Sequence, residues 1–189
     1  GFIDAAETWN SRFEGEDFLF GTEPNGWLRR HAGRWRPGAR LLAVADGEGR
    51  NSVWLAQQGF LVEAFDIAEV GVAKARGLAE RAGVHVDFAV AGCDSFDWRP
   101  AYYDGVAAIF IQFADPALRA RLFDRIVESL KPGGILVLQG YTPRQLEYRT
   151  GGPPFLSHLY TADLLRASFA ALEIVELERV VLHHVARVE

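Results

Sequence analysis

The feature that most constrains the fold is a regular alternation of short apolar runs with segments whose apolar residues recur at helical spacing. The runs have the length and the Gly or Pro boundaries of β-strands. They are residues 40–45, 60–65, 84–90, 105–111 and 135–139. The expected helices lie between and after them, at residues 51–58, 69–82, 116–130 and 161–169. Repeated strand–helix units predict a parallel sheet covered by helices on both faces.

Two further apolar runs, residues 172–182 and 185–188, follow the last expected helix and are predicted to close the sheet. The complete prediction is a Rossmann-like α/β fold with a doubly wound, mostly parallel seven-stranded sheet and an antiparallel C-terminal strand. A chain of 189 residues is long enough for one domain with a filled core, but not for two. We therefore expect a single domain over residues 1–189, with a helical cap segment at 1–36 and the core at 37–189.

Composition and charge exclude several classes of partner. The formal net charge is −5, and no block of like charge stands out, so neither nucleic acid nor a membrane surface is expected. No apolar run is long enough to span a membrane, and residues 1–9 lack the basic start of a signal peptide. Cys93 is the single cysteine and forms no internal disulfide, which fits a cytoplasmic location. No cluster has metal-ligand spacing, so no metal is expected.

The first strand–helix turn contains the motif Gly47-Glu48-Gly49. Glycines at this place let the backbone approach a ligand closely, although a plain tight turn explains them as well. Asp66 ends the second expected strand, 19 residues after Gly47. An acid at this distance suits a pair of ribose hydroxyls, and its alternative role is to cap the following helix. Together the two features predict a nucleoside ligand.

A dinucleotide is the competing ligand, because Gly47-x-Gly49-x-x-Ser52 nearly matches the dinucleotide-binding pattern. Two observations argue against it. The chain leaves no length for a separate substrate domain, and an aromatic segment from Trp9 to Asn25 precedes the first strand.

Five stretches of the chain carry a family resemblance: WNSRFEGEDFLFGTEPN, DGEGRNSVWLAQQG, FDIAEVGVAKA, LKPGGILVLQGYTPRQLEYRTGGP and LYTADLLRASF. They resemble class I S-adenosylmethionine-dependent methyltransferases of the bacterial tellurite-resistance type and, more distantly, the thiopurine methyltransferases. The resemblance covers almost the whole chain. It implies methyl transfer from S-adenosylmethionine to a small-molecule acceptor.

The resemblance also implies a cofactor site. The glycine loop would face the amino-acid part of the cofactor, Asp66 would bind the ribose and Ile67 would lie against the adenine. The other implied contacts are the adenine edge, the methionine part after the fourth strand, and an aromatic cap. The complete implied set is Ala45, Asp46, Gly47, Glu48, Gly49, Asn51, Asp66, Ile67, Cys93, Asp94, Gln112, Phe113, Trp9 and Phe20. Arg12 and Phe13 belong to the same cap segment.

The chain departs from the broad pattern of these enzymes at three positions. Ala43 and Ala45 stand where class I enzymes usually have an acid and a glycine, and Gly92 stands where an acid often meets the adenine amino group. We expect Asp46 to take the place of the first acid, and Asp94 or the backbone to take the place of the second.

The sulfonium cofactor is an activated methyl donor, so the enzyme mainly aligns the nucleophile. A soft nucleophile, such as a thiol or a chalcogen oxyanion, needs little help from a general base, and no base is identified. Candidate substrate-side residues are Tyr141, Tyr148, His158 and Arg12, and residues 139–160 are expected to form part of the substrate wall. Cys93 is interpreted as a small buried residue, and His183 and His184 as structural. Two other functions stay open: a non-catalytic S-adenosylmethionine-binding protein and an NAD(P)-dependent reductase.

Overall fold

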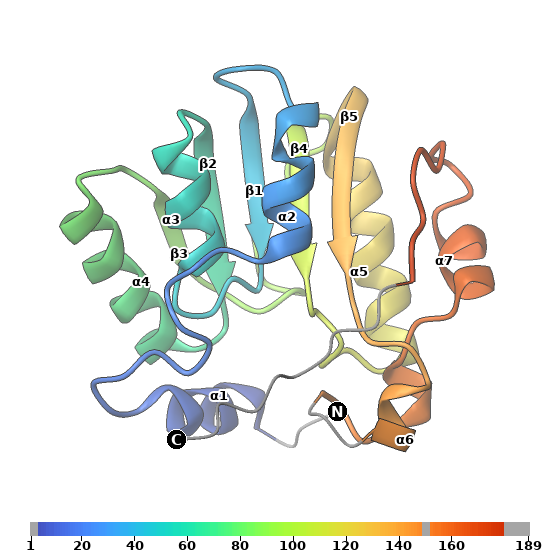
Figure 1. Cartoon of the computed structure of the whole chain (residues 1–189), viewed down its shortest axis with the longest axis horizontal. Coiled ribbons are helices and arrows are strands. Elements are labelled where there is room, and N and C mark those ends of the chain that lie inside the picture. The colour runs from blue at the N-terminus through green and yellow to red at the C-terminus, as the bar shows by residue number, and fades with distance from the viewer. Residues whose placement is uncertain (1–3, 149–151, 180–189) are drawn as a thin grey trace.

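The computed structural model describes residues 4–148 and 152–179 and contains one parallel β-sheet (Figure 1). The strands are β1 (Arg40–Val44), β2 (Leu61–Asp66), β3 (Asp87–Val90), β4 (Tyr103–Ile109) and β5 (Leu130–Gln139). The order across the sheet is β3-β2-β1-β4-β5, and every neighbouring pair is parallel. The carboxyl ends of the strands therefore share one edge of the sheet.

Helices cover both faces of this sheet. The longer ones are α1 (Ala5–Phe13), α3 (Arg50–Gln57), α4 (Glu69–Ala82), α5 (Pro116–Ser129) and α7 (Ala162–Ser168). The shorter ones are α2 (Gly26–His31), η1 (Ala32–Arg34), α6 (Gln145–Tyr148) and η2 (Leu156–His158). The alternation of α3, α4 and α5 with the strands confirms the Rossmann-like α/β prediction.

Alternate side chains of each strand enter opposite cores. In β1, Leu42 and Val44 pack with α5 and α7, whereas Leu41 and Ala43 pack with α2 and α3. Successive side chains of a strand point to opposite faces, so a central strand must be apolar throughout to bury both. This requirement explains the nearly continuous apolar runs of β1 and β4.

The N-terminal residues serve two different parts of the molecule. Helix α1 lies at the edge formed by the carboxyl ends of the strands (Figure 1). Helix α2 instead packs on the sheet, where Leu28, Ala32 and Trp35 join one of the two cores. Only the first part of this segment is therefore placed to cover a ligand at the carboxyl ends.

The prediction of seven strands with an antiparallel C-terminal strand is wrong for the part of the chain that the structure describes. That part has five strands, all parallel. Residues 172–179 form no strand in it, although their apolar residues suggested one, and most of them are exposed to solvent. The remainder of the predicted pair, residues 180–182 and 185–188, lies outside the described residues.

The boundary between α5 and β5 is a second correction. Residues 131–134 were predicted to separate the helix from the strand, but β5 begins at Leu130. Leu130 pairs with Tyr103 and Ile135 pairs with Gly105, so the ladder contains an irregularity between these pairs. Gly133 has φ +80° there, and a Cβ at Gly134 would lie 2.8 Å from the Lys131 carbonyl oxygen. The glycines thus permit a bulge inside the strand.

Candidate functional site at the carboxyl ends of the strands

The turn after β1 and the end of β2 are joined by Asp66. Its Oδ2 accepts a hydrogen bond from the Gly47 N–H at 2.9 Å, and its Oδ1 accepts one from the Ala68 N–H at 2.9 Å. Burial raises the pKa of Asp66 above its usual value, and these backbone donors oppose the shift. A carboxylate has about four acceptor positions, so each oxygen retains capacity for a ligand hydroxyl. This geometry suits the expected role at a ribose.

The alternative role for Asp66, as the cap of α4, is filled by a different residue. The Oδ1 of Asn10, in α1, accepts the hydrogen bond from the Val70 N–H at 3.0 Å. The residue at the N-cap position, Ala68, makes no side-chain capping bond. A residue 60 positions away therefore caps the helix, and no local sequence pattern predicts this.

Close approach to α4 explains why the loop needs glycine. Gly49 has φ +89°, and a Cβ there would lie 2.7 Å from the Cβ of Ala75. Ala45, just before the loop, has φ +48°, and Phe110, just after β4, has φ +55°. These values cost non-glycine residues about 1–2 kcal/mol each. These two positions lie after β1 and β4, where strain is common at functional sites, and a third, Ala101 with φ +47°, lies before β4.

Asp46 faces the start of α3. Its Oδ1 accepts a hydrogen bond from the Ser52 N–H at 3.3 Å, and its Oδ2 accepts another from the Ser52 hydroxyl. Burial raises the pKa of Asp46 to about 7, against the effect of these two bonds. The candidate replacement for the missing strand acid is thus a carboxyl group that titrates near neutral pH.

Glu48 and Asn51 connect the first turn to the N-terminal segment. Glu48 is buried and accepts hydrogen bonds from the Leu19 N–H at 2.8 Å and from Lys74 Nζ at 2.6 Å. Asn51 Oδ1 accepts one from the Asn25 N–H at 2.9 Å. The sequence analysis missed Lys74 and Asn25, although an Asn directly before α2 is a recognisable helix-capping signal.

Gln112 is buried at the end of β4 and fixes the chain that follows β5. Its Nε2 donates hydrogen bonds to the carbonyl oxygens of Tyr141 at 2.8 Å and His158 at 3.1 Å. The Nδ1 of His158 lies 2.9 Å from the Gln112 carbonyl oxygen. Two predicted residues, Gln112 and His158, therefore meet, but these hydrogen bonds join them to each other and to the backbone rather than to a ligand. These hydrogen bonds hold in place the segment that is expected to form the substrate wall.

Tyr141 is a candidate substrate-side residue that lies near Arg50, at the start of α3. Its ring stacks on Phe110, with ring centroids 4.7 Å apart. Burial raises the pKa of Tyr141, and the nearby Arg50 partly opposes this shift. Burial also lowers the pKa of Arg50, and the negative charge of Asp46 opposes this shift. Tyr148, by contrast, lies in α6 with 53% of its surface exposed.

The loop after β3 borders the expected adenine position. Ile67 is close to Gly92, where an added Cβ would lie 3.5 Å from the Ile67 Cδ1. Cys93 is buried, and burial raises the pKa of its thiol to about 12, which is consistent with a structural residue. Asp94 is exposed and forms an ion pair with Arg121 at 2.9 Å, which lowers the pKa of Asp94.

The expected aromatic cap is partly packed and partly exposed. Phe13 is buried, and its ring would lie 3.3 Å from a Cβ at Gly47. Trp9 stacks on Phe13 at 5.5 Å, and the Arg12 guanidinium lies 4.4 Å from the centre of the Trp9 ring. Phe20 is 52% exposed, whereas Phe113 packs against the core on the α5 side. Phe13 therefore makes the direct contact with the glycine loop.

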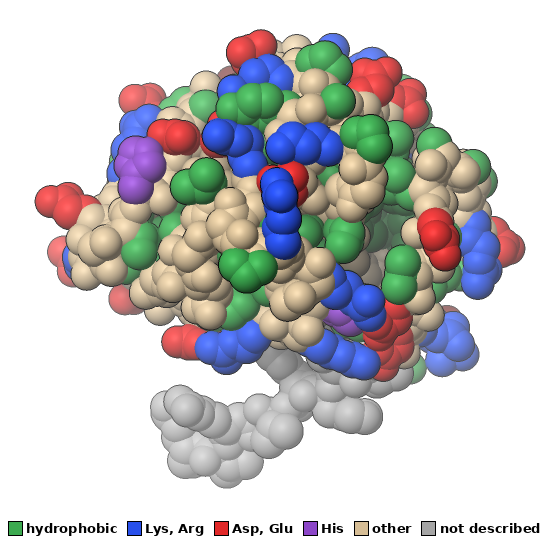
Figure 2. Space-filling view, turned by 90° about the horizontal axis from the view of Figure 1, so that it is seen from above, with side chains coloured by type: hydrophobic (Ala, Val, Ile, Leu, Met, Phe, Trp, Pro, Cys, Tyr) green, Lys and Arg blue, Asp and Glu red, His purple; other side chains and the backbone are tan. Residues whose placement is uncertain are grey.

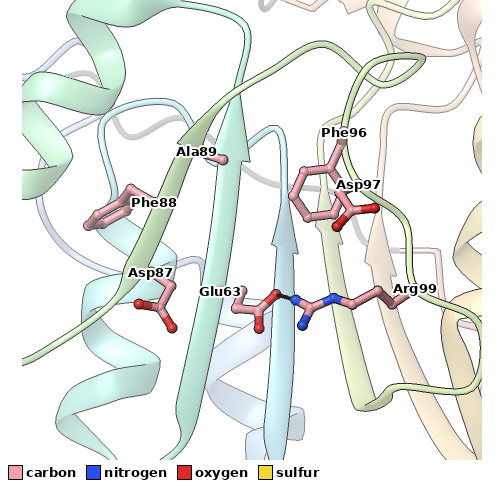
Figure 3. A pocket seen from close by; sticks show the side chains of 7 residues that line it. All are labelled: Glu63, Asp87, Phe88, Ala89, Phe96, Asp97 and Arg99. Carbon is pink, nitrogen blue, oxygen red and sulfur yellow. Dashed lines mark hydrogen bonds and ion pairs between the residues drawn. The ribbon is translucent and has the colours of Figure 1, made fainter.

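A separate hollow of about 310 Å³ lies beside β2 and β3 (Figure 3). Its lining includes Glu63 and Arg99, which form an ion pair with each other. Glu63 also accepts a hydrogen bond from the Tyr103 hydroxyl at 2.5 Å. None of the predicted site residues lines this hollow.

Two absences hold for residues 4–148 and 152–179. This part of the chain has no group of three or more His, Cys, Asp or Glu residues arranged to hold a metal ion. It also has no helix that is long and apolar enough to cross a membrane.

Comparison with known proteins gives the family of this central region. Residues 41–134, from β1 into β5, match a family model described as a methyltransferase domain. These residues are similar to methyltransferase domains. They contain the glycine loop, Asp66 and the ends of β3 and β4. The match supports a methyltransferase-type domain over these residues.

Three proteins similar to this chain have different stated activities. A ubiquinone biosynthesis O-methyltransferase of Paramagnetospirillum magneticum is 36% identical over 100 residues, which cover 53% of this chain and 39% of the relative. A Geobacter sulfurreducens methyltransferase in complex with S-adenosylhomocysteine shares the fold, with a TM-score of 0.65, 23% identity and coverage of 89% and 72%. A [4+2]-cyclase is similar with a TM-score of 0.63, 25% identity and coverage of 77% and 53%. The chain spans less than half the length of the curated relatives it matches.

Proposed function

We propose that this protein transfers the methyl group of S-adenosylmethionine to a small soft nucleophile, in the manner of the tellurite-resistance type. The observation that carries the proposal is the junction of the glycine loop with Asp66, inside the region that matches the methyltransferase domain. The Gly47 N–H holds Asp66 at the end of β2, where the carboxylate would accept the two ribose hydroxyls. Ile67 and the loop at Gly92 would border the adenine.

A soft acceptor, such as a thiol or a chalcogen oxyanion, suits the chemistry of the described site. A hard hydroxyl or amine needs a general base near the methyl group. The Nδ1 of His158 is occupied by a backbone carbonyl, and burial raises the pKa of the Tyr141 hydroxyl, which disfavours its anion. A thiolate or an oxyanion reaches the site already ionised and needs alignment and the exclusion of water.

Calorimetric titration with S-adenosylmethionine, S-adenosylhomocysteine and NADH tests the cofactor. We expect micromolar binding of the first two and none of NADH. Asp66→Ala removes the ribose acceptors and should weaken binding by about tenfold or more, the usual scale for hydrogen bonds to a charged group. Asp163→Ala is the matched control, because the Asp163 side chain is 99% exposed in α7 and pairs only with Arg166 among the ion pairs described. Binding of NADH alone would contradict the proposal.

The acceptor is tested by the formation of S-adenosylhomocysteine with small thiols, selenite, tellurite, phenols and amines. Turnover with thiols or chalcogen oxyanions and not with phenols or amines is the expected result. The reverse pattern would reject the soft-nucleophile assignment and keep the methyltransferase.

A second candidate function is a protein that binds S-adenosylmethionine without transferring its methyl group. Ala43 stands at the usual place of an acid on β1. Asp46, its expected replacement, is hydrogen-bonded to Ser52, and both observations support this candidate. Micromolar binding without turnover of any acceptor in the panel is the outcome that would favour it.

A further inference from the structure

Lys74 of α4 is surrounded by three oxygen acceptors. Its Nζ donates hydrogen bonds to the Glu48 Oε1 at 2.6 Å, the Asp17 carbonyl oxygen at 2.6 Å and the Phe13 carbonyl oxygen at 3.0 Å. An ammonium group has three protons, so these contacts use all of its donors. Two of the three acceptors are backbone carbonyl oxygens of residues 13–19. We call this segment the strap.

Glu48 completes this arrangement from the glycine loop. Its side chain is 3% exposed, and its second oxygen accepts the hydrogen bond from the Leu19 N–H at 2.8 Å. Glu48 thus binds Leu19, at the end of the strap, directly. It binds Phe13, at the start of the strap, through Lys74. Removal of one partner from an ion pair this well buried would leave the other charge uncompensated and would destabilise the folded protein.

The strap, the glycine loop and α4 also pack directly on one another. A Cβ at Gly71, in α4, would lie 3.0 Å from the Phe13 ring and 3.1 Å from the Gly47 carbonyl oxygen. A larger side chain there would require the Phe13 ring or the Gly47 carbonyl to move by a few tenths of an ångström. Movement of the strap would therefore change the packing of Gly47, which lies beside Asp66.

We propose that the ion pair between Lys74 and Glu48 is a clasp that holds the strap over the glycine loop and slows the release of S-adenosylmethionine. This inference rests on the proposed function. Lys74 and Glu48 act as positioning residues: the carboxylate of Glu48 is neutralised by Lys74, and the strap covers the loop that faces the amino-acid part of the cofactor. Opening of the clasp is the step that admits and releases the ligand.

The variant Lys74→Met/Glu48→Leu tests the clasp. It replaces the buried pair by apolar side chains of similar volume, a change that usually leaves folding stability unaffected or improved. The matched control is Lys131→Met/Asp104→Leu, at the opposite edge of the sheet. There Lys131 Nζ lies 3.2 Å from Asp104, which also accepts a backbone hydrogen bond, from the Arg40 N–H at 2.8 Å.

Two measurements follow. Hydrogen exchange of the ligand-free protein should become faster at the Leu19 amide in the clasp variant and not in the control. Stopped-flow dissociation of S-adenosylhomocysteine should accelerate on the order of tenfold or more, because several charge-assisted bonds are lost. If Lys74 and Glu48 had only a structural role, the variant would change the melting temperature and leave the dissociation rate of S-adenosylhomocysteine unchanged.

The results separate the clasp from the proposed function. Equal dissociation rates in the wild type and the variant, or an unchanged Leu19 amide, would overturn the clasp while the cofactor assignment stands. No binding of S-adenosylmethionine or S-adenosylhomocysteine to the wild type would overturn the proposed function, and with it the role of the clasp in cofactor release.

Discussion

At the scale of single residues, the site combines groups whose environments oppose their usual behaviour. Asp46 is a buried acid beside Ser52, Cys93 is a buried thiol, and Ala45 has a left-handed backbone. The burial of Asp46 and the backbone of Ala45 cost free energy, and all three residues belong to the expected cofactor set. Such costs are tolerated where the surrounding structure holds the residue in place.

Asp46→Asn should change how stability depends on pH. The wild-type pKa is raised from 3.8 to about 7, so the folded state keeps a proton that the unfolded state releases between these values. Wild-type stability therefore contains a contribution that is lost as pH rises from about 4 to 7 and is constant above. Relative to Asp46→Asn, the wild type should lose about 1–3 kcal/mol between pH 5 and pH 7.5.

Urea unfolding at several pH values measures this difference. Asp163→Asn, at the exposed position in α7, is the control and should run parallel to the wild type. A wild-type curve that also runs parallel to Asp46→Asn would show that Asp46 ionises normally in the folded protein.

Sequence reasoning placed candidate site residues in the loops after the strands, but it did not predict their hydrogen-bond partners. Gly47 and Asp66 were predicted to share a nucleoside ligand, and the structure joins them by a hydrogen bond at the ends of neighbouring parallel strands. The capping of α4 by Asn10 and the bond of Glu48 to Leu19 could not be predicted, since they join residues 60 and 29 positions apart. Such contacts depend on where α1 packs, and no periodic pattern encodes that placement.

At the scale of elements, α4 was the easiest to predict and β5 the hardest. The apolar spacing of α4 and its final Gly83, with φ +67°, mark a helix with both ends where they were expected. Lys131-Pro132-Gly133-Gly134 instead has the composition of a turn. It lies within β5 because Leu130 finds a partner in Tyr103 before the bulge, and that pairing is a property of the sheet.

Gly134→Ala should therefore destabilise the protein. An added Cβ would lie 2.8 Å from the Lys131 carbonyl oxygen and 3.0 Å from the Leu130 Cδ2, and the first of these is backbone that cannot turn away. We expect a loss of about 1–3 kcal/mol, the usual range for overpacking. Denaturant unfolding with an unchanged slope would measure it.

Gly77→Ala is the matched control for this element. Gly77 lies within α4, and an added Cβ would meet only the flexible end of Arg81, at 3.4 Å. Replacing glycine by alanine inside a helix stabilises it by about 0.5–1 kcal/mol. The two substitutions should thus have opposite signs, and equal effects would contradict the steric argument at Gly134.

At the scale of the whole molecule, the expected cofactor residues lie at one edge of the sheet, whereas the opposite edge carries mixed charge. Figure 2 shows Lys and Arg side chains interspersed with acidic ones on the face at the amino ends of the strands. There Asp104 lies within 3.3 Å of both Arg36 and Lys131. The expectation that nucleic acid is no partner rests on the net charge of −5 and stays a prediction.

The cofactor should stabilise the whole fold, because its expected contacts follow four of the five strands in the described sheet. A ligand that binds only the folded state at 100 times its Kd adds about 2.7 kcal/mol to the free energy of unfolding. For a domain of this size, that corresponds to a rise in Tm of about 5–10 °C. S-adenosylhomocysteine should produce this shift in a thermal melt, and NADH at the same concentration should not. An equal shift with NADH would mean that the junction of Gly47 and Asp66 accepts a ribose without selecting the sulfur-containing half of the cofactor.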